Sequence, residues 1–433
     1  MLISSTFNGS TRIARSYSAS PQKRGGSLFK RSLLFLFTFF LFFPTNFMGI
    51  TFYKYVGITI SLVVIMAMAR DKKSIKAVSN RYFIAAFILF VSGMIGALTF
   101  GHIDFHGSIK MAQNLVLLVI IIYAAKDELD FKALLWGVAL GGLISVISSL
   151  WFERAMSMSR VAGIMGNANG FGQISVQTAI VITGLALMRK HFSKWVLLLL
   201  TVPCLIGLFD SASKGATISL VLAVLSFMLF KRTRKTAVVL SISTILLVSI
   251  AAPAIFFERW QHVFTPKRFG GQSAAEVRLN LAYQGMEVYK SHPAFGVGFG
   301  NSQSGMEDVD IYHPRPTHNV FAQALAEVGT VGTAAFGYLL AITLINLFKI
   351  VKRNRAWNQS QLIGATFMAL FVAVFAGQLT SGNYIHSIWY LLLGAAYSFQ
   401  KMGADNPNGR KYVRRNKRYM TMTAKDREII GSE

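Results

Sequence analysis

The sequence predicts an all-α, polytopic integral membrane protein with about twelve transmembrane helices. Of its 433 residues, 53% are hydrophobic and only 14% are charged, whereas about a quarter of the residues in a soluble protein are charged. Apolar runs long enough to cross a bilayer core about 30 Å thick recur along most of the chain. This composition excludes an ordinary soluble enzyme.

The apolar runs define the predicted spans. The first run follows a basic stretch, as in a signal peptide, but no small-residue cleavage site follows it, so we expect it to be retained as a membrane anchor. The spans are predicted near residues 32–45, 47–69, 82–100, 111–125, 133–152, 172–188, 195–209, 215–230, 236–256, 319–348, 361–380 and 384–400.

The distribution of basic residues predicts the orientation. The formal net charge is +26, from 44 Lys and Arg against 18 Asp and Glu. With the N-terminus in the cytoplasm, the cytoplasmic segments hold 33 of the 44 basic residues, as the positive-inside rule requires. Both termini are therefore predicted to be cytoplasmic, and the positive charge needs no nucleic-acid partner. The predicted organisation is a disordered basic leader at 1–31, nine transmembrane helices within 32–256, a hydrophilic loop at 257–317, three further helices within 318–400 and a basic tail at 401–433.

The loop at 257–317 is the only long connection on the non-cytoplasmic side of this topology, so we look for chemistry there first. Residues 274–290 place apolar side chains at helical spacing and predict an amphipathic helix on the membrane surface. The following HPAFGVGFGN segment contains Gly296, Gly298 and Gly300. A tight turn is the favoured interpretation, because the G-x-G-x-G spacing differs from the G-x-G-x-x-G of nucleotide-binding loops.

Two ionisable residues stand out at the start of the span that follows the loop. His318, with Asn319, is predicted at the outer membrane surface, where it could move a proton near neutral pH or simply cap the helix. Glu327 is the one acidic residue inside a span. A carboxylate in the membrane is costly, so we expect Glu327 to be functional or to pair with an outer Arg or Lys.

Three cations are predicted at the outer ends of spans or in the loop: Arg160, Lys214 and Arg278. Together they could bind an anionic group through charge-assisted hydrogen bonds to phosphate oxygens. Each one alone is better explained as a side chain that reaches toward the headgroups. No metal is expected, because neither the HIDFH segment at 102–106 nor the EDVD segment at 307–310 supplies an obvious full ligand set. The single cysteine, Cys204, lies in an apolar run and excludes an intramolecular disulfide.

The outer residues together resemble the O-antigen ligase and O-antigen polymerase superfamily of bacterial envelopes. The resemblance rests on Arg278, the HPAFGVGFGN segment, the THN of 317–319 and the E-x-G-x-x-G of 327–332. The upstream segments SRVAGIMGNANGFG, with Arg160 and Asn169, and DSASKGA, with Lys214, also look like superfamily motifs. One departure is Lys214, which stands where the family usually has arginine and lacks its planar, two-pronged geometry.

The resemblance implies a metal-independent, inverting glycosyltransferase without a cofactor, located in the bacterial inner membrane. Such enzymes take a glycan from undecaprenyl diphosphate at the periplasmic surface. Ligases deliver it to lipid A core, and polymerases deliver it to a second carrier-linked glycan. On this basis we expect Arg278, Arg160 and Lys214 to bind the diphosphate and His318 to act as base, with Asn319, Glu327 and Asn169 in support. The single, compact periplasmic loop favours the ligase over the polymerase.

A transporter or lipid flippase is the alternative from another class, because twelve spans with both termini inside is a common transporter layout. Transporters usually carry ionisable or broken-helix sites near the bilayer midplane. Here the candidate charges are predicted at the outer ends of the spans, which favours chemistry at the membrane surface.

Overall fold

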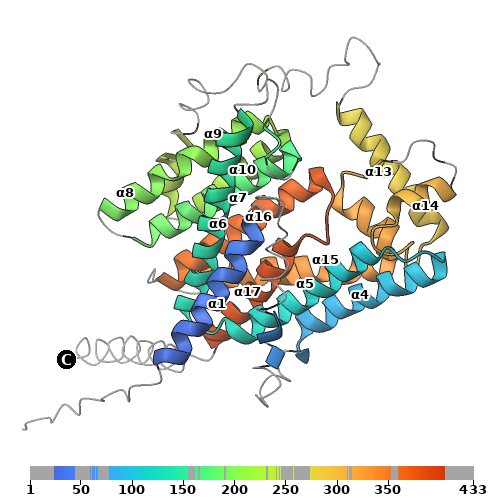
Figure 1. Ribbon diagram of the computed structural model, residues 1–433, viewed down its shortest axis with the longest axis horizontal. Helices are drawn as coiled ribbons and strands as arrows, with labels where there is room; N and C mark the ends of the chain where they lie inside the picture. The colour runs from blue at the N-terminus through green and yellow to red at the C-terminus, as the bar shows by residue number, and fades with distance from the viewer. Residues whose placement is uncertain are drawn as a thin grey trace, which may run out of the picture.

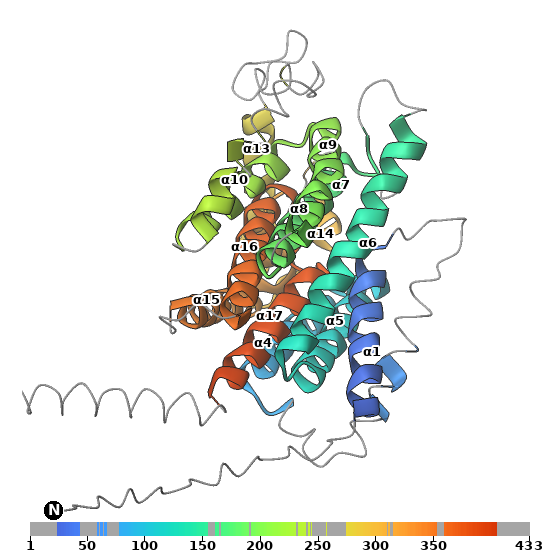
Figure 2. The same ribbon diagram turned by 90° about the vertical axis from the view of Figure 1, so that its left-hand side faces the viewer.

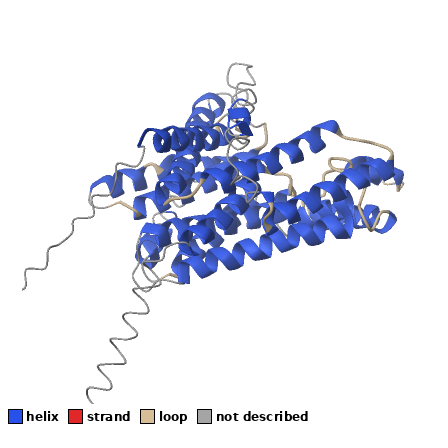
Figure 3. Ribbon diagram, turned by 90° about the horizontal axis from the view of Figure 1, so that it is seen from below, coloured by secondary structure: helices blue, strands red, loops and turns tan. Residues whose placement is uncertain are grey.

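The described secondary structure is entirely α-helical (Figure 3). The computed structural model describes residues 24–43, 59, 61–63, 65–66, 78–154, 161–163, 166–189, 192–230, 233–239, 241–242, 244, 257, 274–309, 311, 315–352 and 359–404. The helices are α1 (Arg24–Phe42), α4 (Arg81–Phe100), α5 (Phe105–Ala124), α6 (Glu128–Arg154), α7 (Ala168–Leu187), α8 (Phe192–Leu199), α9 (Thr201–Ser211), α10 (Lys214–Met228), α13 (Ala274–Ser291), α14 (Ser302–Asp308), α15 (Val320–Lys352), α16 (Gln359–Ser381) and α17 (Ser387–Ala404).

Seven segments of the described chain are long and apolar enough to cross a membrane, which confirms a polytopic all-α protein. They are α4, α5, α6, α7, α15, α16 and the α8–α9 pair, Phe192–Ser211. The predicted spans near 32–45, 215–230 and 384–400 correspond to α1, to the shorter α10 and to α17. The runs near 47–69 and 236–256 lie mostly outside the described residues, so the count of twelve stays a prediction.

The helices form two packed groups, which Figures 1 and 2 show from two sides. In one group α4 and α5 pack with α15 and α17. In the other group α7 packs against α6, α9, α10 and α16, and α16 also packs against α10. The most apolar windows of α7 and α16 are 89% and 83% buried, against 39% for α4. The two buried helices therefore form the centre, and the apolar side chains that α4 exposes are suited to face lipid.

The contacts between loops agree with the predicted topology, because they join segments that it places on the same side of the membrane. Asn301, after the glycine segment, donates from its side chain to the backbone oxygen of His102, between α4 and α5, at 2.8 Å. At the opposite end of the bundle, Arg81 binds Gln400 at 3.2 Å. We call the end that carries residues 101–104, 211–213, 315–319 and 382–386 the outer end.

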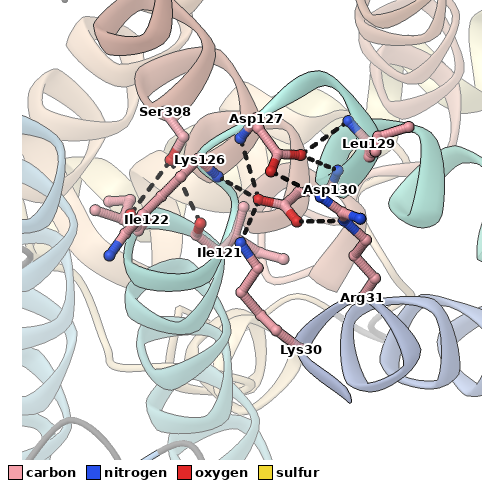
Figure 4. Close-up of polar contacts among 9 residues, drawn as sticks. All are labelled: Lys30, Arg31, Ile121, Ile122, Lys126, Asp127, Leu129, Asp130 and Ser398. Atoms are coloured by element: carbon pink, nitrogen blue, oxygen red, sulfur yellow. Dashed lines mark hydrogen bonds and ion pairs between the residues drawn. The ribbon is translucent and has the colours of Figure 1, made fainter. Parts of the chain in front are cut away.

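At the inner end, a cluster of charged side chains attaches α1 to the turn between α5 and α6 (Figure 4). Asp130 is fully buried, and its carboxylate accepts from the Lys30 ammonium at 2.6 Å and from the Arg31 guanidinium at 3.4 Å. The same carboxylate accepts from the backbone amides of Lys126 and Asp127. Asp127 pairs with Arg31 at 3.0 Å. Burial acts to raise the pKa of Asp127, but hydrogen bonds from the Asp130 amide and from Arg31 outweigh it, so the net pKa is lowered.

Replacement of Asp130 by alanine is expected to destabilise the protein by about 2–3 kcal/mol, because charge-assisted hydrogen bonds to two cations and two amides are lost at once. The measurement is thermal unfolding of the purified protein. Glu287→Ala is the matched control, since Glu287 makes an exposed ion pair with Lys290 on α13. Such surface pairs contribute at most about 1 kcal/mol. Equal melting temperatures for the two variants would contradict a stabilising role for Asp130.

Candidate functional site

Helix α15 is interrupted at Gly329, although the sequence predicts one continuous span over 319–348. Gly329 has φ 61° and ψ −164°, a conformation outside the helical region that is essentially restricted to glycine. An interruption leaves backbone groups on both sides without helical partners, and in a membrane these groups must be satisfied by other donors and acceptors.

The HPAFGVGFGN segment supplies those partners. It lies beside the break and forms two pairs of backbone hydrogen bonds, one with carbonyl groups before Gly329 and one with amide groups after it. The bonds are Val297 N to Ala326 O at 2.9 Å, Gly298 N to Glu327 O at 2.8 Å, Thr330 N to Pro293 O at 2.9 Å and Val331 N to Ala294 O at 3.2 Å. The Ser92 hydroxyl of α4 donates to Val328 O at 2.7 Å. The break is therefore held by the loop and by α4.

The glycines of this segment adopt the turn conformation that the spacing predicts. Gly296, Gly298 and Gly300 all have positive φ, between 67° and 91°. A Cβ at Gly296 would overlap the backbone of Glu327, and one at Gly298 would overlap Ala97 of α4. The amides of Val297 and Gly298 donate to α15, so they are not available to a phosphate group.

Replacement of Gly329 by alanine is expected to destabilise the protein by more than the roughly 1–3 kcal/mol of backbone strain alone, because the new Cβ would also overlap the Ala294 backbone. Gly337→Ala on the same helix is the matched control, since nothing lies within 4 Å of a Cβ there. Alanine in a helix interior is favoured over glycine by about 0.5–1 kcal/mol. Thermal unfolding of the purified proteins should give a lower melting temperature for Gly329→Ala than for Gly337→Ala. Similar melting temperatures would show that stability does not depend on the glycine at the break.

Glu327 is fully buried beside this break, and its described partners are neutral. Its carboxylate accepts from the Tyr384 hydroxyl and from the Gln323 amide, each at 2.9 Å. Hydrogen bonds from the Gly300 backbone and from the Ser302 side chain complete the set. Among the described residues, Glu327 therefore does not form the predicted pair with an outer Arg or Lys. Glu327 instead joins α15, the glycine segment and the turn after α16.

His318 and Asn319 lie directly before α15. The Asn319 side chain caps the helix by accepting from the amides of Phe321 and Ala322 at 2.9 and 3.1 Å. His318 has a positive φ of 51° and packs against Gly382, where a Cβ would come 3.1 Å from its backbone. The His318 side chain forms a hydrogen bond to the Ser381 backbone. The end of α16 thus holds the imidazole in place.

Arg278 approaches His318 from the loop helix α13, which occupies the predicted 274–290 segment (Figure 1). Gly285, two turns after Arg278 and on the same face, packs on Thr317 and Ala322. Burial and the Arg278 charge together lower the pKa of His318 below its ordinary value of 6.5, and the hydrogen bond to Ser381 only partly opposes them. The positive charge of Arg278 therefore favours the neutral form of the His318 imidazole.

Lys214 begins α10 and reaches the same end of α16. Ser213 caps α10 through the Ala216 amide at 3.4 Å, and Gly215 packs against Thr380. Residues 380–382 thus contact the Lys214 segment and His318. Both Lys214 and Arg278 are half-buried.

The segment that carries Arg160 and Asn169 adjoins the Lys214 segment. Arg160 lies outside the described residues, but the Val161 amide donates to the Asp210 backbone at 3.2 Å. Asn169 is half-buried in the first turn of α7, whose N-cap is Asn167. Gly172, near the start of α7, packs on Ser211 and Ser213. The motif segments that are far apart in sequence therefore meet at the outer end.

Sequence reasoning missed Gln323 and Tyr384 as partners of Glu327, and it missed the turn at 381–384. The only available signal was the Gly-Asn pair at 382–383 between two apolar runs, which indicates a turn but carries no charge. Within the described chain there is no group of three His, Cys, Asp or Glu that could hold a metal ion. Asp104 of the HIDFH segment caps α5 through the amides of His106 and Gly107.

Part of the chain matches a known protein family. Residues 198–337 match the family described as O-Antigen ligase, which confirms the resemblance that the motifs predict. The matched part is about a third of the chain and contains Lys214, Arg278, His318 and Glu327. A search of curated proteins gave no match.

Proposed function

We propose, on the premise that residues 198–337 form an O-antigen ligase domain, that this protein transfers a glycan from undecaprenyl diphosphate to lipid A core at the periplasmic face of the inner membrane. The observation that carries the proposal is the electrostatic interaction of Arg278 with a half-buried His318, which lowers the pKa of the imidazole. The reaction needs a cation for the departing diphosphate and a base for the acceptor hydroxyl, and this pair supplies both.

Arg278 stabilises the leaving group in this proposal. When the bond between the sugar C1 and the phosphate oxygen breaks, negative charge develops on the diphosphate. A guanidinium group offers two parallel hydrogen bonds to phosphate oxygens, and its charge is most effective where water is excluded. Lys214, whose neighbour Gly215 packs on Thr380, and Arg160 add positive charge. These side chains thereby do work that a metal ion does in other glycosyltransferases.

His318 is the general base. Its lowered pKa keeps the imidazole neutral at pH 7, so it can take the proton of the acceptor hydroxyl as the oxygen attacks C1. The new C1–O bond forms as the old one breaks, undecaprenyl diphosphate leaves, and the anomeric configuration inverts. The hydrogen bond to the Ser381 backbone fixes the ring during proton transfer.

Three residues support this site without touching the reacting atoms. Asn319 caps α15 immediately after His318, and Glu327 connects α15 to the turn at 381–384 through Tyr384. Asn169 lies in the first turn of α7, beside the Lys214 segment. Together they hold the catalytic pair and the flanking cation at fixed positions.

The interrupted helix is also a feature of transporters, which use free backbone groups at such breaks to bind ions. In this protein the carbonyl groups of Ala326, Glu327 and Val328 accept from protein donors. The break is therefore already satisfied by protein, which supports catalysis at the outer end over transport.

The test is a deletion strain whose lipopolysaccharide and carrier-linked glycans are separated on gels. Complementation with the wild-type gene should restore ligated chains, whereas His318→Ala should not. Loss of ligated chains while long carrier-linked polymer survives supports a ligase. Single glycan repeats attached to the lipid A core would instead identify a polymerase. Absence of any periplasmic carrier-linked glycan would identify a transporter. Either result would overturn the ligase assignment.

A further inference from the structure

A lysine in the second turn of α5 lies away from the Arg278–His318 pair. Lys110 and Asn114 are one turn apart and share a face of α5. The Asn114 side chain donates to the Ile385 backbone oxygen at 2.6 Å. This contact sets that face of α5 against the segment between α16 and α17, at the outer end of the bundle.

Among the described residues, Lys110 has a basic neighbour and forms no ion pair with an acidic side chain. Its ammonium group interacts electrostatically with the imidazole of His386, which follows Ile385. Within the described part of the chain, Lys110 forms no ion pair and donates no hydrogen bond. Both side chains are partly exposed. A partly buried ammonium group that has no anionic partner in the described part of the chain is costly in a membrane helix, so an anion from outside the chain would stabilise it.

His386 adds a second hydrogen-bond donor. Its Nδ1 accepts from the Ile388 amide at 3.4 Å, which places the proton of the neutral ring on Nε2. The two side chains therefore present N–H groups and no acceptor, a set that matches the oxygens of a phosphate group.

We propose that Lys110 and His386 bind the phosphate group of a lipid in the outer leaflet. The outer turns of α5 favour a lipid over free phosphate, because Phe105 and Ile109 are 72% and 55% exposed and can contact acyl chains. The site is separate from the Arg278 site, since His318 contacts the 381–382 end of the turn and α5 contacts Ile385. If the proposed transfer reaction holds, this second site positions a phosphate-bearing acceptor lipid beside the base.

Lipid binding to the purified, full-length protein tests the proposal without any glycan donor. Native mass spectrometry measures the affinity for short-chain phosphatidic acid, and a parallel titration uses inorganic phosphate. Lys110→Gln should weaken phosphatidic acid binding about tenfold, which is the loss of about 1.4 kcal/mol. His386→Gln should weaken it several-fold, and Lys110→Arg should retain it. Lys290→Gln is the control, because Lys290 is an exposed lysine already paired with Glu287.

Two outcomes decide the result. If Lys110→Gln and His386→Gln both bind each probe as the wild type does, the proposal is overturned. If inorganic phosphate binding falls in these variants as much as phosphatidic acid binding, the phosphate site stands and its ligand is free phosphate. Because no transfer is measured, failure of the catalytic proposal would leave this result unchanged.

Discussion

Glycan transfer by a His318→Ala variant is expected to fall by about a hundred- to ten-thousandfold, the usual contribution of a general base. The imidazole is held by a hydrogen bond to the Ser381 backbone, and its removal deletes the base without removing the cap that Asn319 provides. The measurement is transfer of a labelled, carrier-linked glycan to lipid A core by the purified protein.

His106→Ala is the matched control for this variant. His106 is an exposed histidine at the same outer end, and its described contact is through the backbone amide to Asp104. Transfer should stay near the wild-type rate in the control. Wild-type transfer by a folded His318→Ala protein would remove His318 from the mechanism.

The pH dependence of transfer gives an independent check on the same residue. Because burial and Arg278 lower the pKa of His318, the base form persists below pH 6.5, and transfer should fall only as the pH drops through that lowered pKa. In an Arg278→Ala variant the repulsion by the guanidinium is lost, so the pKa of His318 rises. The acidic limb of the residual activity should then move to higher pH. An unchanged limb would show that the two side chains are not coupled.

Arg278→Ala is expected to lower the transfer rate about a hundred- to thousandfold. This is the usual effect of removing one group that stabilises charge in the transition state. Arg278→Lys should recover only part of that loss, because lysine keeps the charge but not the paired hydrogen bonds. Single-turnover kinetics with the carrier-linked donor measure the chemical step separately from binding.

Lys290→Ala on the same helix is the control for Arg278. Lys290 is exposed and paired with Glu287, so its loss should leave the rate unchanged. If Arg278→Lys transfers glycan as fast as the wild type, charge alone is sufficient. If Arg278→Ala transfers glycan as fast as the wild type, Arg278 is not part of the diphosphate site.

The sequence determined the membrane class, most of the span positions and the loop helix at 274–290, because hydrophobicity and helical periodicity are properties of neighbouring residues. It also predicts Arg278, His318 and Lys214 at the outer membrane surface, because the excess of positive charge on the predicted cytoplasmic segments indicates the direction of each span. This orientation stays a prediction.

The tertiary structure alone decided how those residues are held. The break at Gly329 is satisfied by the backbone of 293–298 and by the Ser92 hydroxyl. The buried Glu327 accepts from Tyr384, which is 57 residues away in the sequence. The contact of His318 with Gly382 likewise joins segments that are distant in sequence. Such contacts depend on helix packing and on backbone groups that every residue carries, so no pattern of residue types in one segment could predict them.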